Sequence, residues 1–180
     1  MGRTKNFDRN EVLDSAIQVF WKKGYSDTSL SDLEKATGVN KSGLYSEFKD
    51  KDDIFHESLR RYHENNSTYD LLKAEPLGWN NIENLMKGRI MCKGLKGCFM
   101  AFTMREYNII PVKIRQLLED TSDEVFELFL NNLKAAKVKN PEVMTKTLLT
   151  FSTGMSLKST MFKPEDLVKE VQAFLDLCKK

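Results

Sequence analysis

Apolar residues recur along much of the chain at the three- and four-residue spacing of amphipathic helices. Within the first 65 residues, four such stretches each follow a residue that commonly caps a helix N-terminus: Asp8, Ser29, Asn40 and Asp50. Gly24 and Gly38 stand where the first two helices should end, because glycine favours the position just past a helix C-terminus. We therefore expect four capped helices in this part of the chain.

The rest of the chain predicts further helices. Residues 66–80 contain a proline and a glycine and predict a loop or a broken helix. Four helices are then expected near 80–90, 97–108, 111–136 and 141–161, and Pro164 opens a last one. The fold class is all-α, with about nine helices. We expect an N-terminal domain at 1–50, a connecting helix at 51–66 and a second helical domain at 67–180.

The composition supports a helical fold but does not identify a binding partner. Of 180 residues, 41% are hydrophobic, enough for a core, and only 4 are proline and 9 glycine. The 28 Lys and Arg nearly balance the 26 Asp and Glu. Residues 1–65 carry 11 basic and 12 acidic side chains, a net charge of −1 with histidine neutral. Any basic footprint for nucleic acid must therefore be local.

The three cysteines and the polar first ten residues indicate neither a disulfide framework nor a signal peptide. The strongest apolar patch, residues 98–102, is far shorter than the ~18 residues that suggest a membrane span. We expect a cytoplasmic protein without a membrane partner.

Residues 28–48 read as a helix, a tight glycine-containing turn and a short second helix, the order of a DNA-reading helix-turn-helix. Together with Gly24-Tyr25 before it, Leu44-Tyr45-x-x-Phe48 within it and Phe48-x-x-Lys51 at its end, this segment resembles the tetracycline-repressor (TetR) family of bacterial transcription regulators. The resemblance covers roughly residues 8–65. It implies a helix-turn-helix DNA-binding domain at 1–50, the connecting helix at 51–66 and a helical-bundle regulatory domain for effector binding and dimerisation at 67–180.

The resemblance implies that the second short helix enters the major groove of a double-stranded DNA operator. The expected DNA-binding residues are Thr28, Ser29, Lys41, Ser42, Gly43, Tyr45, Ser46, Lys49 and Lys51. Lys41 and Ser42 are placed to reach base edges, and Tyr45 and Lys51 match family positions that contact phosphate. Glu34 departs from the family pattern, which has a small residue there. Either its stem packs at the helix crossing with the carboxylate outside, or the crossing is wider.

The remaining two thirds resemble the family's regulatory domain. Homodimerisation through the last two helices, about 141–161 and 164–178, would match a palindromic operator. Four small residues could let these helices approach a partner, or could be buried within one subunit: Ser152, Gly154, Ser156 and Ser159. The effector is an unknown small molecule.

A set of large apolar side chains could line an effector pocket, although such sets more often form core. They are Phe99, Phe102, Met104, Phe126, Phe129, Phe151 and Met155. No charged residue stands out as a ligand anchor.

Cys98 offers a second regulatory hypothesis. Lys96-Gly97-Cys98-Phe99-Met100 resembles a Gly-Cys stretch in one branch of the family, which includes repressors that sense oxidants through cysteine. Lys93, Lys96 and a helix N-terminus would lower the pKa of this thiol, and Cys92 is a possible resolving partner. Cys98 as a small buried hydrophobic residue is the alternative.

Two other function classes stay open. An enzyme is disfavoured because the chain has no dinucleotide, phosphate-loop or nucleophile-elbow motif, and we expect no cofactor or metal. His56 and His63, beside Glu57 and Glu64, could form a metal site or a solvated helix face. The third class is a helical small-molecule-binding module with a non-functional helix-turn-helix, for which the −1 charge and Glu34 are the support.

Overall fold

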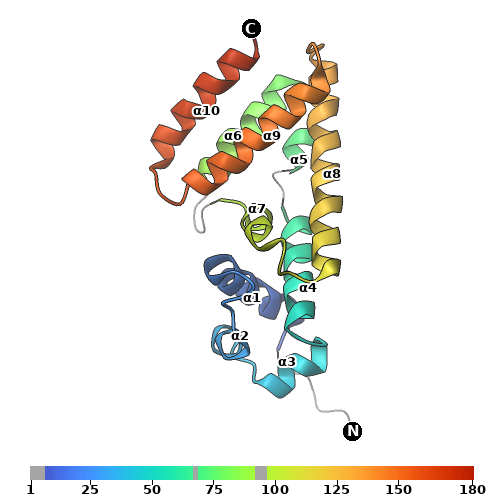
Figure 1. Ribbon diagram of the computed structural model, residues 1–180, viewed down its shortest axis with the longest axis vertical. Coiled ribbons are helices and arrows are strands. Elements are labelled where there is room, and N and C mark those ends of the chain that lie inside the picture. Colours follow the sequence, from blue (N-terminus) through green and yellow to red (C-terminus); the bar gives the residue numbers. More distant parts are fainter. Residues whose placement is uncertain (1–6, 67–68, 92–96) are drawn as a thin grey trace. The chain divides into compact units, whose positions relative to one another are not determined.

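The computed structural model describes residues 7–66, 69–91 and 97–180, and these are helical with no strand among them (Figure 1). The helices are α1 (Arg9–Lys23), α2 (Leu30–Thr37), α3 (Lys41–Glu47), α4 (Lys51–Glu64), α5 (Asp70–Lys73), α6 (Trp79–Met91), α7 (Phe99–Thr103), α8 (Val112–Ala135), α9 (Pro141–Lys158) and α10 (Pro164–Cys178), with a short 3₁₀ helix, η2 (Met104–Glu106), after α7. The all-α prediction is confirmed.

Local capping signals set the starts of the first four helices. Asp8 accepts the backbone N–H groups of Asn10 and Glu11 at the start of α1, and Asp50 accepts that of Asp53 at the start of α4. Ser29 and Asp32 form a reciprocal capping box at α2. These bonds satisfy N–H groups that a helix leaves unpaired at its N-terminus.

Two details differ from the sequence expectation. The four-residue helix α5 lies in the segment expected to be a loop or a broken helix, so the described residues hold ten α-helices instead of about nine. The helix expected at 97–108 is shorter, because α7 ends at Thr103 and η2 takes over. Apolar spacing alone does not distinguish a continuous α-helix from an α-helix that tightens into a 3₁₀ turn.

The chain divides into two compact units that are not contiguous in sequence. The first contains residues 1–65 and 102–118, and the second residues 66–101 and 119–180. In the first unit, α1 packs against α2 and α4, and Phe20 and Phe55 meet with ring centroids 4.6 Å apart. Arg61 of α4 pairs with Asp14 of α1 through two 2.7 Å contacts. These contacts hold the helix-turn-helix segment on α1 and α4.

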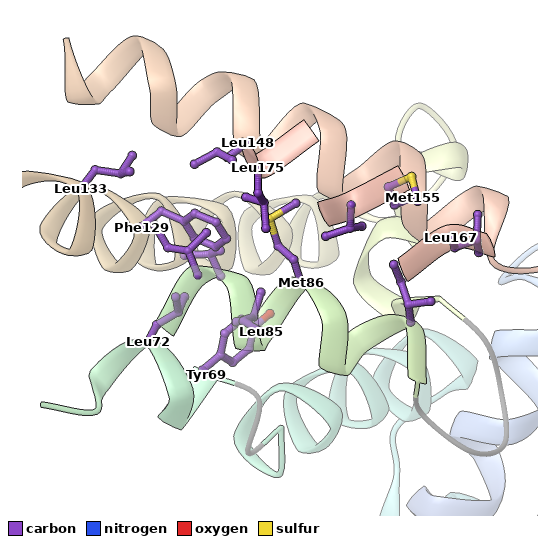
Figure 2. Packing of buried hydrophobic residues seen from close by; sticks show 14 residues of the cluster. Tyr69, Leu72, Leu85, Met86, Phe129, Leu133, Leu148, Met155, Leu167 and Leu175 are labelled. Carbon is purple, nitrogen blue, oxygen red and sulfur yellow. The ribbon is translucent and has the colours of Figure 1, made fainter. Parts of the chain in front are cut away.

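The second unit has its own core, made by α5, α6, α8, α9 and α10 (Figure 2). Phe129, Leu133, Leu148 and Leu175 are among its fully or almost fully buried side chains. Asn132 is also fully buried and is satisfied on both sides of its amide. Its oxygen accepts from the Gly78 N–H at 2.9 Å and the Asn81 amide at 3.0 Å, and its nitrogen donates to the carbonyls of Leu72 and Leu128. No helix of the described chain is long and apolar enough to cross a membrane.

Candidate functional site

Helix α3 buries one face and exposes the other. Asn40 caps it by accepting the Gly43 N–H at 2.9 Å. Leu44 and Phe48 are buried in the first unit, with 0% and 1% of their surface exposed. The opposite face is exposed and consists of Lys41, Ser42, Tyr45 and Ser46. The Lys41 ammonium lies 5.7 Å from the centroid of the Tyr45 ring, so a cation and an aromatic ring stand together on this face.

Glu34 of α2 is a capping residue of α3. Its carboxylate accepts a hydrogen bond from the backbone N–H of Lys41, the first residue of α3. A negative charge at a helix N-terminus is stabilising because it meets the positive end of the helix dipole. The sequence had suggested packing of the stem or a wider crossing. Glu34, which departs from the family pattern, therefore caps α3, a role that neither of these two alternatives included.

Gly43 serves packing inside the domain. A Cβ atom at this position would lie 2.6 Å from Cγ1 of Val39, which is buried in the turn between α2 and α3. Valine is stiff at χ1 and cannot easily move aside. The backbone of α3 therefore approaches the turn closely because residue 43 has no side chain.

The two hydroxyls at the start of α2 form hydrogen bonds within the first unit. Thr28 is 1% exposed and donates to the Gly24 carbonyl at 2.6 Å, which corrects the expectation that it is a DNA-binding residue. Ser29 is exposed, but its hydroxyl donates to the Asp32 carboxylate at 2.7 Å. Asp32 also pairs with Lys23 at 2.7 Å. Contacts from Lys23 and Ser29 hold the pKa of Asp32 far below its usual value, so this helix end carries its own anion.

Lys49 and Lys51 differ in their surroundings. The Lys49 residue is exposed. Lys51 is half-buried and donates to the carbonyls of Tyr25 at 3.0 Å and Thr28 at 3.1 Å, with its ammonium 4.3 Å from the Tyr25 ring centroid. Tyr25 in turn donates to Asp52, and burial together with this carboxylate raises the pKa of the phenol. Lys51 thus fixes the turn before α2, which the sequence did not indicate.

Among the residues that the structure describes, His56 and His63 of α4 belong to no metal-binding cluster. His56 Nδ1 lies 3.1 Å from Glu57, whose carboxylate also accepts from Arg9 at 3.1 Å and Arg60 at 3.0 Å. The charge of Glu57 is therefore already shared by two guanidinium groups. Within residues 7–66, 69–91 and 97–180, no group of three or more His, Cys, Asp and Glu side chains is placed to hold a metal ion.

The apolar residues expected to line an effector pocket are dispersed. Phe99 and Phe129 are buried core residues, whereas Met104 is 41% exposed. Phe151 stacks on Phe174 with centroids 3.8 Å apart. Phe102 and Phe126 are half-buried. Of the expected set, Met155 lines the cavity described in the second unit, which lies among α6, α9 and α10.

Three of the four small residues of α9 and its C-terminus are buried within the subunit. Ser152, Ser156 and Ser159 line the same cavity with Met155, and Arg89 of α6 joins them. Gly154 is exposed. Arg89 was not expected at a ligand site, because its position on α6 carries no signal of what α9 places opposite it.

Cys98 is 7% exposed and immediately precedes the five-residue helix α7. This burial fits the expectation of a small core residue. Cys92 and the lysines at 93 and 96 lie outside the described residues, so the neighbourhood expected to activate the thiol is not described. Cys178 is half-buried, and burial raises the pKa of its thiol.

The helix-turn-helix segment is similar to a family of known sequences. Residues 12–58 match the profile of the bacterial regulatory proteins of the tetR family. The HTH-type transcriptional repressor ComR of Escherichia coli strain K12 is 49% identical over 61 residues, which are 34% of this chain and 29% of ComR. The uncharacterised HTH-type transcriptional regulator YezE of Bacillus subtilis strain 168 is 37% identical over 78 residues, 43% of this chain and 40% of YezE. The matched segments span less than half of these curated relatives.

Comparison with solved structures extends the likeness to the whole chain. A cysteine mutant of the TetR family regulator CifR, solved with a 26-base-pair double-strand operator DNA, superposes with a TM-score of 0.85 at 22% identity, covering 97% of this chain and 98% of CifR. The reduced form of NemR from E. coli gives 0.79 at 17% identity, covering 94% and 96%. The resemblance read from the sequence is confirmed: the chain carries a TetR-family N-terminal domain and has the fold of TetR-family regulators.

Proposed function

We propose that this chain is a DNA-binding transcriptional repressor that reads a double-stranded operator with α3. The observation that carries the proposal is the exposed face of this helix, where Lys41, Ser42, Tyr45 and Ser46 stand free of the core while Leu44 and Phe48 anchor the other side. Lysine and serine can bond to base edges, and tyrosine and lysine to phosphate. Exposed Lys49 extends the same polar segment past the end of α3.

The names of the relatives support the same function. ComR is named a repressor, and IcaR of Staphylococcus epidermidis, 33% identical over 51 residues, is named a negative transcriptional regulator. The family match, at residues 12–58, contains the helix-turn-helix. We propose residues 1–50 as the reading domain, 51–66 as its connecting helix and 67–180 as the effector-binding and dimerisation domain, acting in the cytoplasm and without enzymatic activity.

The repressor acts as a homodimer on a palindromic operator. One helix of seven residues reads few base pairs, so two copies related by a two-fold axis are needed for a specific site. The last two helices and the turn between them expose several large apolar side chains, as expected of a dimer interface: Val143, Leu157, Met161, Phe162 and Leu177. These side chains, rather than the buried serines of α9, are the candidates for contact between subunits.

Release from DNA follows binding of a small effector in the second unit, or modification of Cys98. An effector can release DNA only if it binds the DNA-free arrangement of the dimer more tightly than the DNA-bound one. Among the described residues, the cavity at α6, α9 and α10 is the candidate effector site.

The test is a titration of the purified full chain against the DNA just upstream of its own gene, by fluorescence anisotropy over a salt series. We expect sequence-dependent binding whose logarithm falls linearly with the logarithm of salt concentration. Lys41→Ala should weaken binding to this DNA, and Lys146→Ala, which removes an exposed lysine of α9, should leave it unchanged. Equal binding to unrelated DNA by all three proteins would contradict sequence reading. If the chain bound small molecules but no DNA, it would be a small-molecule-binding module with a non-functional helix-turn-helix.

A further inference from the structure

The carboxylate of Glu34 lies at the start of the helix proposed to read DNA. The half-buried side chain reaches from α2 to α3 and accepts the backbone N–H of Lys41, the first residue of α3, and this contact is exposed to solvent. The N-terminal residues of a recognition helix are the ones that contact base edges in the major groove. With α3 in the groove, the Glu34 carboxylate therefore lies beside the bases that the start of α3 contacts.

The hydrogen bond to α3 leaves part of this carboxylate available. It uses one oxygen, Oε1, and within residues 7–66, 69–91 and 97–180 Glu34 forms no ion pair with a basic side chain. Asp32, the other carboxylate of α2, uses both of its oxygens: one pairs with Lys23 at 2.7 Å, and the other accepts from the Ser29 hydroxyl at 2.7 Å. Of these two carboxylates, Glu34 is the one that can accept a hydrogen bond from a partner outside the protein.

Lys41 supplies the opposite charge at the same end of α3. The residue is exposed, and its ammonium lies 5.7 Å from the centroid of the Tyr45 ring. In the part of the chain that the structure describes, this ammonium forms no ion pair, so Glu34 does not neutralise it. Two residues that contact each other thus present a hydrogen-bond acceptor and a hydrogen-bond donor at the start of α3.

We propose that Glu34 and Lys41 together read one G·C base pair in each half of the operator. The carboxylate accepts from the N4 amino group of cytosine, and the ammonium donates to N7 or O6 of guanine. In the major groove a G·C pair presents this donor beside these acceptors. An A·T pair presents its amino group between two acceptors, so a carboxylate placed there meets a negative partner. This inference rests on the proposed function and makes Glu34 a specificity-determining residue.

The charge of Glu34 also disfavours incorrect sequences. A carboxylate at the interface is repelled by the phosphates of any DNA, and this repulsion is independent of sequence. Only a duplex that offers the cytosine amino group at the right position compensates for it. Specificity commonly combines a favourable contact to the correct partner with an unpaired charge against the others. Glu34 therefore lowers affinity for unrelated DNA more than for the operator.

The test is selection from a random duplex pool by the full chain and by Glu34→Gln, followed by anisotropy titration of the selected duplex and of the same duplex with the G·C pair changed to A·T. The amide oxygen of glutamine can still accept the Lys41 N–H, so the cap is kept while the charge is lost. We expect the preference for G·C at one symmetric position to relax or to move toward A·T, since glutamine suits adenine. Discrimination between the two duplexes should fall by about 5-fold or more.

The matched control is Glu11→Gln. Glu11 is an exposed carboxylate in the first turn of α1, so this variant makes the same change of charge in the same unit. It should leave the selected sequence unchanged, and unrelated DNA should bind it less tightly than it binds Glu34→Gln. Lys41→Ala should relax the same base pair as Glu34→Gln, because it removes the donor to guanine. Thermal unfolding of each variant checks that the fold is kept.

Three results would overturn the inference and leave the repressor function intact. They are an enriched palindrome that is identical for Glu34→Gln and the unchanged chain, an equal loss of preference with Glu11→Gln, and relaxation by Glu34→Gln and Lys41→Ala at different base pairs. In the first case Glu34 would act only as a cap of α3. A pool that stays random with the unchanged chain would contradict the proposed function itself, and this inference with it.

Discussion

The Glu106 carboxylate accepts the backbone N–H of Tyr25 at 2.7 Å, and the next N–H, of Ser26, at 2.9 Å. One acidic side chain from η2 thus holds two consecutive amides of the turn between α1 and α2. Gly24 makes the approach possible, because a Cβ there would lie 2.7 Å from Glu106 Oε2, and its φ of 87° also disfavours other residues. The segment 102–118 is attached to the first unit at this turn.

Glu106→Gln should lower the free energy of unfolding of the chain by about 1–2 kcal/mol, because a carboxamide presents one acceptor oxygen and turns an N–H₂ group toward the second amide. Urea denaturation followed by circular dichroism measures the change. Glu127→Gln, an exposed position on α8, is the control and should change stability by less than about 0.5 kcal/mol. Equal stability of the two variants would mean that the Glu106 contacts contribute nothing net.

Tyr45→Ala should weaken binding to the operator by roughly 10-fold while leaving the unfolding midpoint nearly unchanged, since the side chain is 41% exposed on α3. Anisotropy titration and thermal unfolding measure the two effects. Tyr107→Ala removes a tyrosine of similar exposure, 38%, outside the helix-turn-helix and should leave DNA affinity unchanged. If both variants lost the same affinity, α3 would not be the reading element.

Asn132→Leu should destabilise the chain by about 3 kcal/mol or more. The substitution leaves the Gly78 N–H, the Asn81 amide and the Leu72 carbonyl without their buried partner, and unsatisfied buried polar groups are costly. Asn131→Leu makes the same change at the exposed neighbouring position. Urea denaturation should show a large loss for the first variant and a small change for the second.

Glu83 of α6 forms two ion pairs. One carboxylate oxygen lies 2.6 Å from the ammonium of Lys87 on the same helix, and the other lies 2.6 Å from the ammonium of Lys179. Lys179 and then Lys87 hold the pKa of Glu83 below its usual value. A lowered folded-state pKa contributes stability above the unfolded value, near 4.3, and this contribution is lost as pH falls through the folded one.

Glu83→Gln should therefore destabilise the chain by up to about 1 kcal/mol at pH 7, since the pair is near the surface, and by less at pH 3. Denaturation of both proteins at the two pH values measures the difference. A loss that is the same at pH 3 as at pH 7 would exclude the ion pairs as its cause.

The Cys98 hypothesis makes a chemical prediction. Because the residue is 7% exposed, its alkylation by iodoacetamide should be slow in the folded chain and fast in denaturant, as peptide mass spectrometry would show. If an oxidant releases DNA, Cys98→Ser should abolish that release. Release that persists in Cys98→Ser would remove this thiol from the mechanism.

Local signals account for what the sequence predicted well. Asp8, Ser29, Asn40 and Asp50 each cap the helix that follows, because capping depends on residues only two or three positions apart. The exposed face of α3 followed from the same local pattern.

What the sequence did not predict involves residues distant from one another. The sequence around Glu106 does not indicate that its partner is Tyr25, 81 positions away. The sequence around Arg89 likewise does not indicate that Ser152 lies next to it. Thr28 and Lys51 have the residue types of DNA contacts. The Thr28 hydroxyl nevertheless donates to the Gly24 carbonyl four residues earlier, and tertiary packing directs the Lys51 ammonium to the carbonyls of Tyr25 and Thr28. Side-chain type alone cannot decide between a partner in the protein and a partner outside it.

The measurement that tests the central claim most directly is selection of DNA from a random duplex pool by the full chain, repeated with Tyr45→Ala. Sequence reading by a two-fold dimer predicts an enriched palindrome whose half-site centres lie about 10 base pairs, or a multiple of this, apart. The enrichment should weaken or disappear with Tyr45→Ala. A pool that stays random with the unchanged chain, or an identical enriched sequence with both proteins, would contradict reading by α3.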